Sequence, residues 1–166
     1  LGPYLGYLPQ DIELFSGTIA ENICRFSTQN SEKIFDAAKA AGIHQMILNL
    51  SNGYETEINA GSLSAGQRQK VGLARAIYGS PKLIILDEPN SNLDDQGEQD
   101  LLNALRKMKD LGSTIIIITH RTSILALVDS LMTMKEGTIV NYGRRDDVLR
   151  EMSSQSSKVT QMPSKA

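Results

Sequence analysis

The chain has 166 residues, 40% hydrophobic and 22% charged, which suits one globular domain or most of one. Its net charge of −2 gives no basic surface, which argues against nucleic acid as a partner. Its longest apolar runs are strand-sized and no signal-peptide pattern is present, so no membrane span is expected in this piece. The one cysteine, Cys24, cannot form an internal disulfide and is predicted to be a small buried side chain in a reducing cytoplasm.

The first part of the chain predicts one strand followed by short helices. In order, we expect a strand at residues 4–8 and helices at 19–26, 32–41 and 43–50. Pro9 ends the strand because proline has no N–H to donate to a neighbour. Thr18, with Glu21 three residues later, predicts a capping box, and Ser31 predicts the cap of the next helix. These elements predict a small helical subdomain.

The second part predicts alternating helices and strands. In order, we expect a helix at 65–78, a strand at 83–87, a helix at 96–110, a strand at 114–119, a helix at 122–128, strands at 130–134 and 138–142, and a helix at 145–152. The strands at 83–87 and 114–119 are continuously apolar, which predicts burial on both faces of a parallel sheet. The helix between them is then a right-handed crossover. Residues 153–166, rich in Ser, Gln and Lys, are predicted to be a disordered tail.

The start of the helix at 65–78 has the features of an anion site. Ser64 stands at the N-cap position with Gln67 three residues later, which predicts a second capping box. Gly66 has no side chain that would block a close approach, and the free N–H groups of a helix N-terminus can receive a phosphate. A capping box alone contributes only about 1 kcal/mol of stability, so the pattern needs support from the rest of the chain.

Acidic and basic side chains follow the two apolar strands. Asp87 and Glu88 end the first strand, at the edge where α/β proteins bind ligands. An aspartate there can hold Mg²⁺ through water, and because neighbouring strand residues point to opposite sides, Glu88 could have a separate role. His120 follows the second strand directly after Thr119. The other histidine, His44, lies on a predicted helix without such neighbours and is predicted to be structural.

These motifs, in this order, resemble those of the ATP-binding-cassette (ABC) ATPases. Residues 63–76 resemble the signature motif and its helix, and residues 83–88 resemble Walker B. Gln10, in the sequence Leu-Pro-Gln-Asp, resembles the Q-loop glutamine, His120 the switch histidine, and residues 91–94 the D-loop that crosses to a partner subunit. Ala65 stands where many members have glycine, and we expect this small residue to be tolerated.

The resemblance implies a fold, a reaction and ligands. The fold is an α/β, P-loop NTPase-like parallel sheet core, here partial, with a small helical subdomain at about 16–80 and core elements at about 81–152. ATP and Mg²⁺ are the implied cofactors. Glu88 is implied to orient and deprotonate the attacking water, His120 to contact the γ-phosphate, and Asp87 and Gln10 to hold the metal. The residues implied to contact nucleotide are Ser64, Ala65, Gly66, Gln67 and Asp94.

The chain departs from the family pattern in two places. It contains no Gly-Lys pair, so the lysine loop of Walker A is absent. Because it also starts at Leu1 rather than Met, residues 1–152 are expected to be the carboxy-terminal portion of an ATPase domain, cut just after the ATP-binding loop. The loop at 56–62, which in exporters carries a coupling glutamate, is shortened, with Ala60 near the expected acid; Glu57 could substitute. Coupling to the membrane domain is therefore expected to differ.

Two segments indicate the branch of the family. Residues 14–23 look like those of exporters, and residues 87–94 look like those of type I secretion ATPases. The resemblance implies a homodimeric exporter at the cytoplasmic face of a bacterial inner membrane. Its implied partners are its own transmembrane domain, a second copy, and membrane-fusion and outer-membrane proteins. Alternatives are an exporter of lipids, peptides or drugs, a non-transport ABC ATPase acting on DNA or ribosomes, and a truncated product that only binds. The fragment alone is expected to be inactive.

Overall fold

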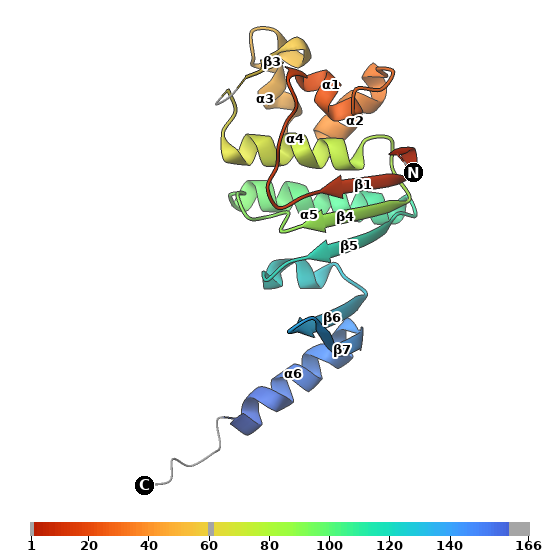
Figure 1. The fold of residues 1–166 in the computed structure, drawn as a ribbon, viewed down its shortest axis with the longest axis vertical. Coiled ribbons are helices and arrows are strands. Elements are labelled where there is room, and N and C mark those ends of the chain that lie inside the picture. The colour runs from red at the N-terminus through yellow and green to blue at the C-terminus, as the bar shows by residue number, and fades with distance from the viewer. Residues whose placement is uncertain (1, 60–61, 160–166) are drawn as a thin grey trace. The chain divides into compact units, whose positions relative to one another are not determined.

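The computed structural model describes residues 2–59 and 62–159, with the side chains of 155–159 left aside. It divides into two compact units, one ending at His120 and one beginning at Arg121, which are described separately. The first unit holds a parallel sheet with helices, so the predicted α/β class is confirmed (Figure 1). The predicted boundary near residue 80 between a helical subdomain and a core stays a prediction.

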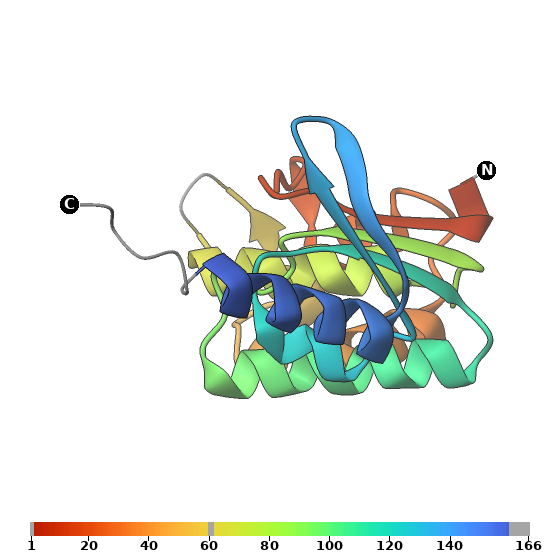
Figure 2. The same ribbon diagram turned by 90° about the horizontal axis from the view of Figure 1, so that it is seen from below.

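Three parallel strands form the sheet of the first unit, in the order β1 (Leu5–Leu8), β4 (Leu83–Asp87) and β5 (Thr114–Ile118). Leu8 pairs with Leu86, and Leu86 pairs with Ile117, so the three strands end together. Helix α5 (Asp95–Asp110) connects β4 to β5 and lies along one face of the sheet (Figure 2). The predicted parallel pairing across this helix is confirmed.

The two faces of the sheet differ in burial. Leu8, Ile84 and Leu86 point to one face and are fully buried. Side chains alternate along a strand, so Ile116 and Ile118 of β5 point to the opposite face and are 48% and 52% exposed. The prediction that both apolar strands are buried on both faces is therefore wrong for β5. Its isoleucines suit an extended backbone, but β5 is an edge strand of the described sheet.

The helical part of the first unit begins with the capping box predicted at Thr18. The Thr18 hydroxyl accepts from the Glu21 N–H at 3.1 Å and the Glu21 carboxylate accepts from the Thr18 N–H at 2.8 Å. Cys24 is buried, as predicted. The elements are β2 (Gly17–Thr18), α1 (Ile19–Cys24), α2 (Ser31–Ala40), α3 (His44–Leu48), a 3₁₀ turn (Gly53–Glu55) and β3 (Glu57–Ile58), which pairs antiparallel with β2.

The predicted cap of α2 is off by one residue. Asn30, not Ser31, is the N-cap, because the Asn30 side chain accepts from the Lys33 N–H at 2.9 Å while Ser31 is already helical. Adjacent Asn and Ser residues are both good caps, so the sequence alone did not separate them. The Ala60 position of the shortened loop lies outside the described residues.

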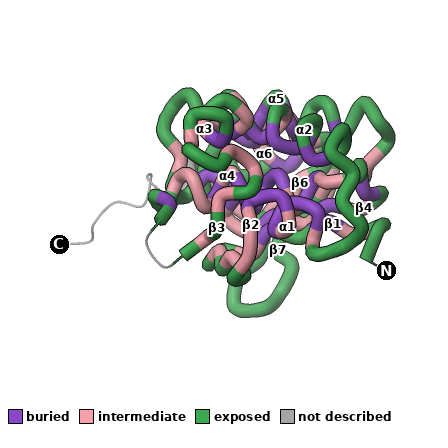
Figure 3. The backbone as a smooth tube through the Cα atoms, turned by 90° about the horizontal axis from the view of Figure 1, so that it is seen from above, coloured by how far each residue is buried: buried purple, intermediate pink, exposed green. Residues whose placement is uncertain are grey.

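Helix α4 (Ala65–Ile77) packs between the smaller helices and the sheet, and it carries many of the unit's buried side chains (Figure 3). Arg25 joins its C-terminus to the sheet. The guanidinium donates to the carbonyls of Arg75 and Ala76 at 2.9 and 3.1 Å, and to those of Gly2 and Leu5 at 2.6 and 2.8 Å. Burial and the neighbouring Arg75 charge lower the pKa of Arg25. The last carbonyls of α4 thus gain a cationic partner.

The second unit contains a hairpin and a helix. The helix predicted at 122–128 is a 3₁₀ helix (Thr122–Ala126). Strands β6 (Ser130–Lys135) and β7 (Thr138–Arg144) pair antiparallel, and α6 (Arg145–Val159) follows. No helix in the described part of either unit is long and apolar enough to cross a membrane.

The predicted disordered tail at 153–166 is wrong for residues 153–159, which continue α6. The hydroxyls of Ser153 and Ser154 donate to the carbonyls of Leu149 and Glu151 at 2.9 and 2.8 Å, so serine is accommodated inside the helix. Residues 160–166 lie outside the described part of the chain.

Replacing Arg25 with alanine is expected to lower the free energy of unfolding by about 2 kcal/mol, because it removes charged hydrogen bonds from half-buried carbonyls. Urea denaturation of the chain measures this change. The matched control is Arg106→Ala, which removes an exposed guanidinium from α5 and is expected to change stability by less than about 0.5 kcal/mol. Equal losses for the two variants would contradict a special role for Arg25.

Candidate functional site

Three predicted site residues follow the carboxyl ends of three adjacent strands. Gln10 follows β1, Glu88 follows β4, and His120 follows β5. Because the strands are parallel and in register, their ends meet at one edge of the sheet. The structure therefore brings these three residues to the same edge, as the sequence predicted. This is the edge at which open α/β sheets bind ligands.

Glu88 and His120 are in direct contact. The Glu88 Oε1 atom lies 2.8 Å from the His120 Nδ1 atom. The Glu88 side chain is 16% exposed and that of His120 is 77% exposed, so the pair joins a partly buried carboxylate to a surface imidazole. The other carboxylate oxygen, Oε2, is buried and has no hydrogen-bond partner among the described residues. A buried acceptor without a partner costs free energy, so this oxygen can gain stability by accepting a hydrogen bond from a donor such as water.

The backbone at Glu88 is unusual. Its φ angle is +47°, in the left-handed region that non-glycine residues rarely adopt. The Glu88 N–H donates to the Ile118 carbonyl at 2.8 Å, and the Glu88 carbonyl accepts from the Ser91 N–H at 3.1 Å. Asp87 is the last strand residue and Glu88 the first of a strained turn. The left-handed turn at Glu88, and not simple strand alternation, thus sets the direction of Glu88 relative to Asp87. Backbone strain of this kind is common at functional sites.

The signature turn has the predicted capping box. The Ser64 hydroxyl accepts from the Gln67 N–H at 3.2 Å, and the Gln67 Oε1 atom accepts from the Ser64 N–H at 2.9 Å. Ser64 and Ala65 are exposed, so the positive end of α4 is open to solvent. Within the part of the chain that the structure describes, no hydrogen bond joins Ser64 to Glu88 or His120.

The segment after Glu88 is fixed to helix α5. Asn90 is fully buried and its amide donates to the Glu98 carboxylate on α5 at 3.1 Å. The Asp94 carboxylate accepts from the Gly97 N–H at 2.8 Å and caps α5. The structure thus gives Asp94 a capping bond, and its contact with a nucleotide stays a prediction.

Sequence reasoning missed Gln69. It is 1% exposed, and its amide nitrogen donates to the carbonyls of Pro89 and Glu88 at 2.9 and 3.4 Å. A signal was available, because Gln69, Leu73 and Ala76 are spaced as one face of a helix whose other members are apolar. A polar residue in such a stripe must find a buried partner.

The predicted metal ligands match the chemistry of Mg²⁺. Asp87 ends β4 and Gln10 follows the neighbouring strand β1. They offer a carboxylate and an amide oxygen, the hard oxygen donors that this ion prefers. Among the described residues, no group of three or more His, Cys, Asp or Glu side chains could hold a metal.

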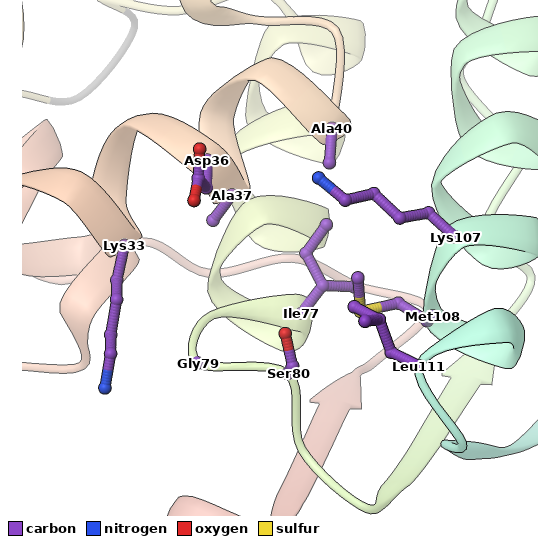
Figure 4. Close-up of a pocket in the computed structure, with 10 residues that line it drawn as sticks. All are labelled: Lys33, Asp36, Ala37, Ala40, Ile77, Gly79, Ser80, Lys107, Met108 and Leu111. Atoms are coloured by element: carbon purple, nitrogen blue, oxygen red, sulfur yellow. The ribbon is translucent and has the colours of Figure 1, made fainter.

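A pocket of about 190 Å³ in the first unit lies elsewhere. Figure 4 shows it between α2, the turn after α4 and the last part of α5. It is lined by Lys33, Asp36, Ala37, Ala40, Ile77, Gly79, Ser80, Lys107, Met108 and Leu111. None of the predicted site residues lines this pocket. The Glu88–His120 pair is thus an open edge site rather than part of this cavity.

Comparison with known proteins agrees with the motifs. The sequence model of the ABC transporter family matches residues 2–91. The chain is 54% identical over 155 residues to the type I secretion system ATP-binding protein PrsD of Rhizobium meliloti, covering 92% of this chain and 27% of that protein. It is 39% identical over 153 residues to the ATP-binding cassette sub-family B member 6 of Rattus norvegicus, covering 90% of this chain and 18% of that one.

A solved structure gives the same result in three dimensions. A bacterial Atm1-family ABC exporter with ATP bound superimposes with a TM-score of 0.82 at 31% identity, covering 99% of this chain and 29% of that one. The chain thus spans only 18% to 29% of the length of these relatives. On the matched motifs, the sequence identity and the shared fold, the chain belongs to the ABC transporter family.

Proposed function

We propose that the chain is the carboxy-terminal, catalytic portion of an ATPase that powers a bacterial type I protein exporter. The observation that carries the ATPase assignment is the contact of 2.8 Å between the Glu88 carboxylate and the His120 imidazole. Glu88 directly follows Asp87 in the sequence. The similarity to PrsD and the sequence at 87–94 support the type I branch. The complete protein would couple ATP hydrolysis to transport.

Glu88 is the proposed general base. The Glu88 carboxylate accepts a hydrogen bond from the attacking water and takes its proton as the bond from that water to the γ-phosphorus forms and the bond from the γ-phosphorus to the leaving ADP oxygen breaks. His120 holds the carboxylate through Oε1 and presents its exposed ring toward the γ-phosphate. Asp87 and Gln10 would hold Mg²⁺, which neutralises phosphate charge when bound. The strained Glu88 backbone keeps the base in a fixed orientation before substrate arrives.

The nucleotide site is proposed to be shared by two copies. The exposed N-terminus of α4, with Ser64, Ala65, Gly66 and Gln67, is a site for a phosphate, but among the described residues Ser64 is hydrogen-bonded to Gln67 and not to its own chain's Glu88. A second copy supplies this turn to the Glu88 side, with Asp94 near the shared nucleotide. The lysine loop that the chain lacks comes from sequence outside it. Charge stabilisation is thus assembled only when two complete domains meet.

The remaining partners follow from the family and are proposals. They are a transmembrane domain, membrane-fusion and outer-membrane proteins, with the ATPase at the cytoplasmic face of the bacterial inner membrane. A lipid or drug exporter is the second candidate, because the chain is also 38% identical to an ATP-dependent lipid A-core flippase of Saccharophagus degradans. Stimulation of the ATPase in proteoliposomes by a polypeptide rather than by a lipid or a drug would distinguish the two. The shortened loop beside Glu57 is proposed to alter coupling to the membrane domain.

The isolated chain is expected to show negligible ATP hydrolysis, because it lacks the lysine loop that holds the β- and γ-phosphates. Phosphate release from Mg²⁺-ATP by the purified chain measures this activity, with the complete protein as the positive control. Robust turnover by residues 1–166 would mean that the proposed shared site is wrong.

In the complete protein, Glu88→Gln is expected to keep ATP binding but to lower hydrolysis by about 10²–10⁴-fold, because glutamine cannot take a proton from water. Nucleotide binding and steady-state phosphate release measure the two effects. The control is Glu32→Gln in the exposed first turn of α2, which should leave hydrolysis unchanged. A near-normal rate for Glu88→Gln would rule out Glu88 as the base.

In the same protein, Asp87→Asn is expected to raise the Mg²⁺ concentration for half-maximal hydrolysis by about tenfold, since a neutral amide is a weaker partner for the hydrated ion. A magnesium titration of the hydrolysis rate gives this value. Asp110→Asn, at the exposed end of α5, is the control. An unchanged magnesium requirement for Asp87→Asn would remove Asp87 from the metal site.

A further inference from the structure

Gln69 links the signature helix to the turn that carries the proposed base. Its amide nitrogen donates to the Pro89 carbonyl at 2.9 Å and the Glu88 carbonyl at 3.4 Å. Its Oε1 atom accepts from the Asn92 amide at 3.3 Å. One side chain, 1% exposed, thus holds both ends of the segment 88–92.

This segment needs an external support. Glu88 is held in the left-handed region, and the next residue, Pro89, has no N–H with which to brace the turn. Gln69 supplies donors from α4 to the carbonyls of these two residues. An apolar side chain in its place would leave the buried Pro89 carbonyl without this donor. The need for a donor to these two carbonyls therefore explains why a glutamine is buried at this position.

The first turn of α4 also lies directly against the same segment. A methyl group added at Gly66 would lie 3.0 Å from the Asn92 carbonyl oxygen, which is tighter than ordinary contact. Gly66 and Gln69 are on one helix, so they contact residues 88–92 at two points separated by about one turn. A displacement of the signature turn must move this segment, because packed elements do not deform freely.

We infer that Gln69 is a positioning residue that couples the two nucleotide sites of the dimer. The inference rests on the proposed function, in which the Ser64 turn contacts the nucleotide held mainly by the partner and Glu88 acts on the nucleotide of its own chain. A phosphate that binds at the first turn of α4 changes the position of the Glu88 carboxylate through the hydrogen bonds of Gln69. Occupation of one site thereby sets the geometry of the base in the other.

The test uses the complete protein with Gln69→Leu, which keeps the side-chain volume near its original value and removes every polar contact. The kcat for ATP hydrolysis is expected to fall by about tenfold while KM for ATP changes by less than about twofold, because base geometry and not ground-state binding is disturbed. The Hill coefficient for ATP is expected to fall to about 1, the value for uncoupled sites.

The matched control is Lys70→Met, on the next residue of the same helix. It breaks the 2.9 Å ion pair with Asp100 on α5, and among the described residues the Lys70 amine bonds to Asp100 and the Gly42 carbonyl rather than to the turn at Glu88. Its kcat and Hill coefficient are expected to match those of the unchanged protein. Thermal melting of both variants gives the loss of stability that each causes.

A double-mutant cycle with Ser64→Ala distinguishes coupling from a general loss of structure. If Gln69 transmits the state of the Ser64 turn, Ser64→Ala lowers kcat less in the Gln69→Leu background than in the unchanged one, by at least about threefold. Should Gln69→Leu fail to fold, Gln69→Glu replaces it, since glutamate keeps the size and the acceptor for Asn92 but lacks the amide donor.

Two results would overturn the inference. One is a multiplicative cycle, in which the two substitutions act independently. The other is a Gln69→Leu protein whose kcat and Hill coefficient match those of Lys70→Met. The proposed function fails differently, through hydrolysis that survives Glu88→Gln or is absent from the complete protein. The two failures are therefore separable in one set of measurements.

Discussion

The hydrogen bond from the Glu88 N–H to the Ile118 carbonyl is the contact on which the arrangement of the site depends. It extends the pairing of β4 with β5 by one residue while the Glu88 backbone turns into the left-handed region. His120 follows Ile118 by two residues, so the same bond brings its ring to the Glu88 carboxylate. Parallel strands of equal register thus convert two distant sequence motifs into one dyad.

Helix α4 has a different task along each part of its length. Its N-terminus is open to solvent and capped by Ser64, its middle is fixed to the turn at Glu88 by Gln69, and its C-terminus is held to β1 through Arg25. These contacts fix the middle and the C-terminus of the helix to neighbouring elements. Binding of a phosphate at its open N-terminus is therefore expected to act on the helix as one rigid body. The buried polar contacts therefore serve geometry as much as stability.

Short-range patterns allowed most of the fold and the motifs to be predicted. The Thr18 and Ser64 capping boxes involve residues three apart, so the sequence contains all of the necessary information. The exposure of Ile116 and the length of α6 depend on what packs nearby or on hydrogen bonds inside the helix, and these predictions were wrong. The contact of Gln69 with Pro89 joins residues far apart in sequence and required the structure.

The exposure of the catalytic groups argues for a shared site in physical terms. Transfer of a phosphoryl group to one selected water requires that other water be excluded and that donors be fixed around the developing charge. In one chain the His120 ring is 77% exposed and the Ser64 turn lies open at the surface, while the Glu88 carboxylate is already partly buried. The proposed base is thus oriented within the chain, but its surroundings are not closed. A second surface that covers His120 and offers a positive helix end would complete the enclosure, and α4 of an identical copy has that charge and exposure.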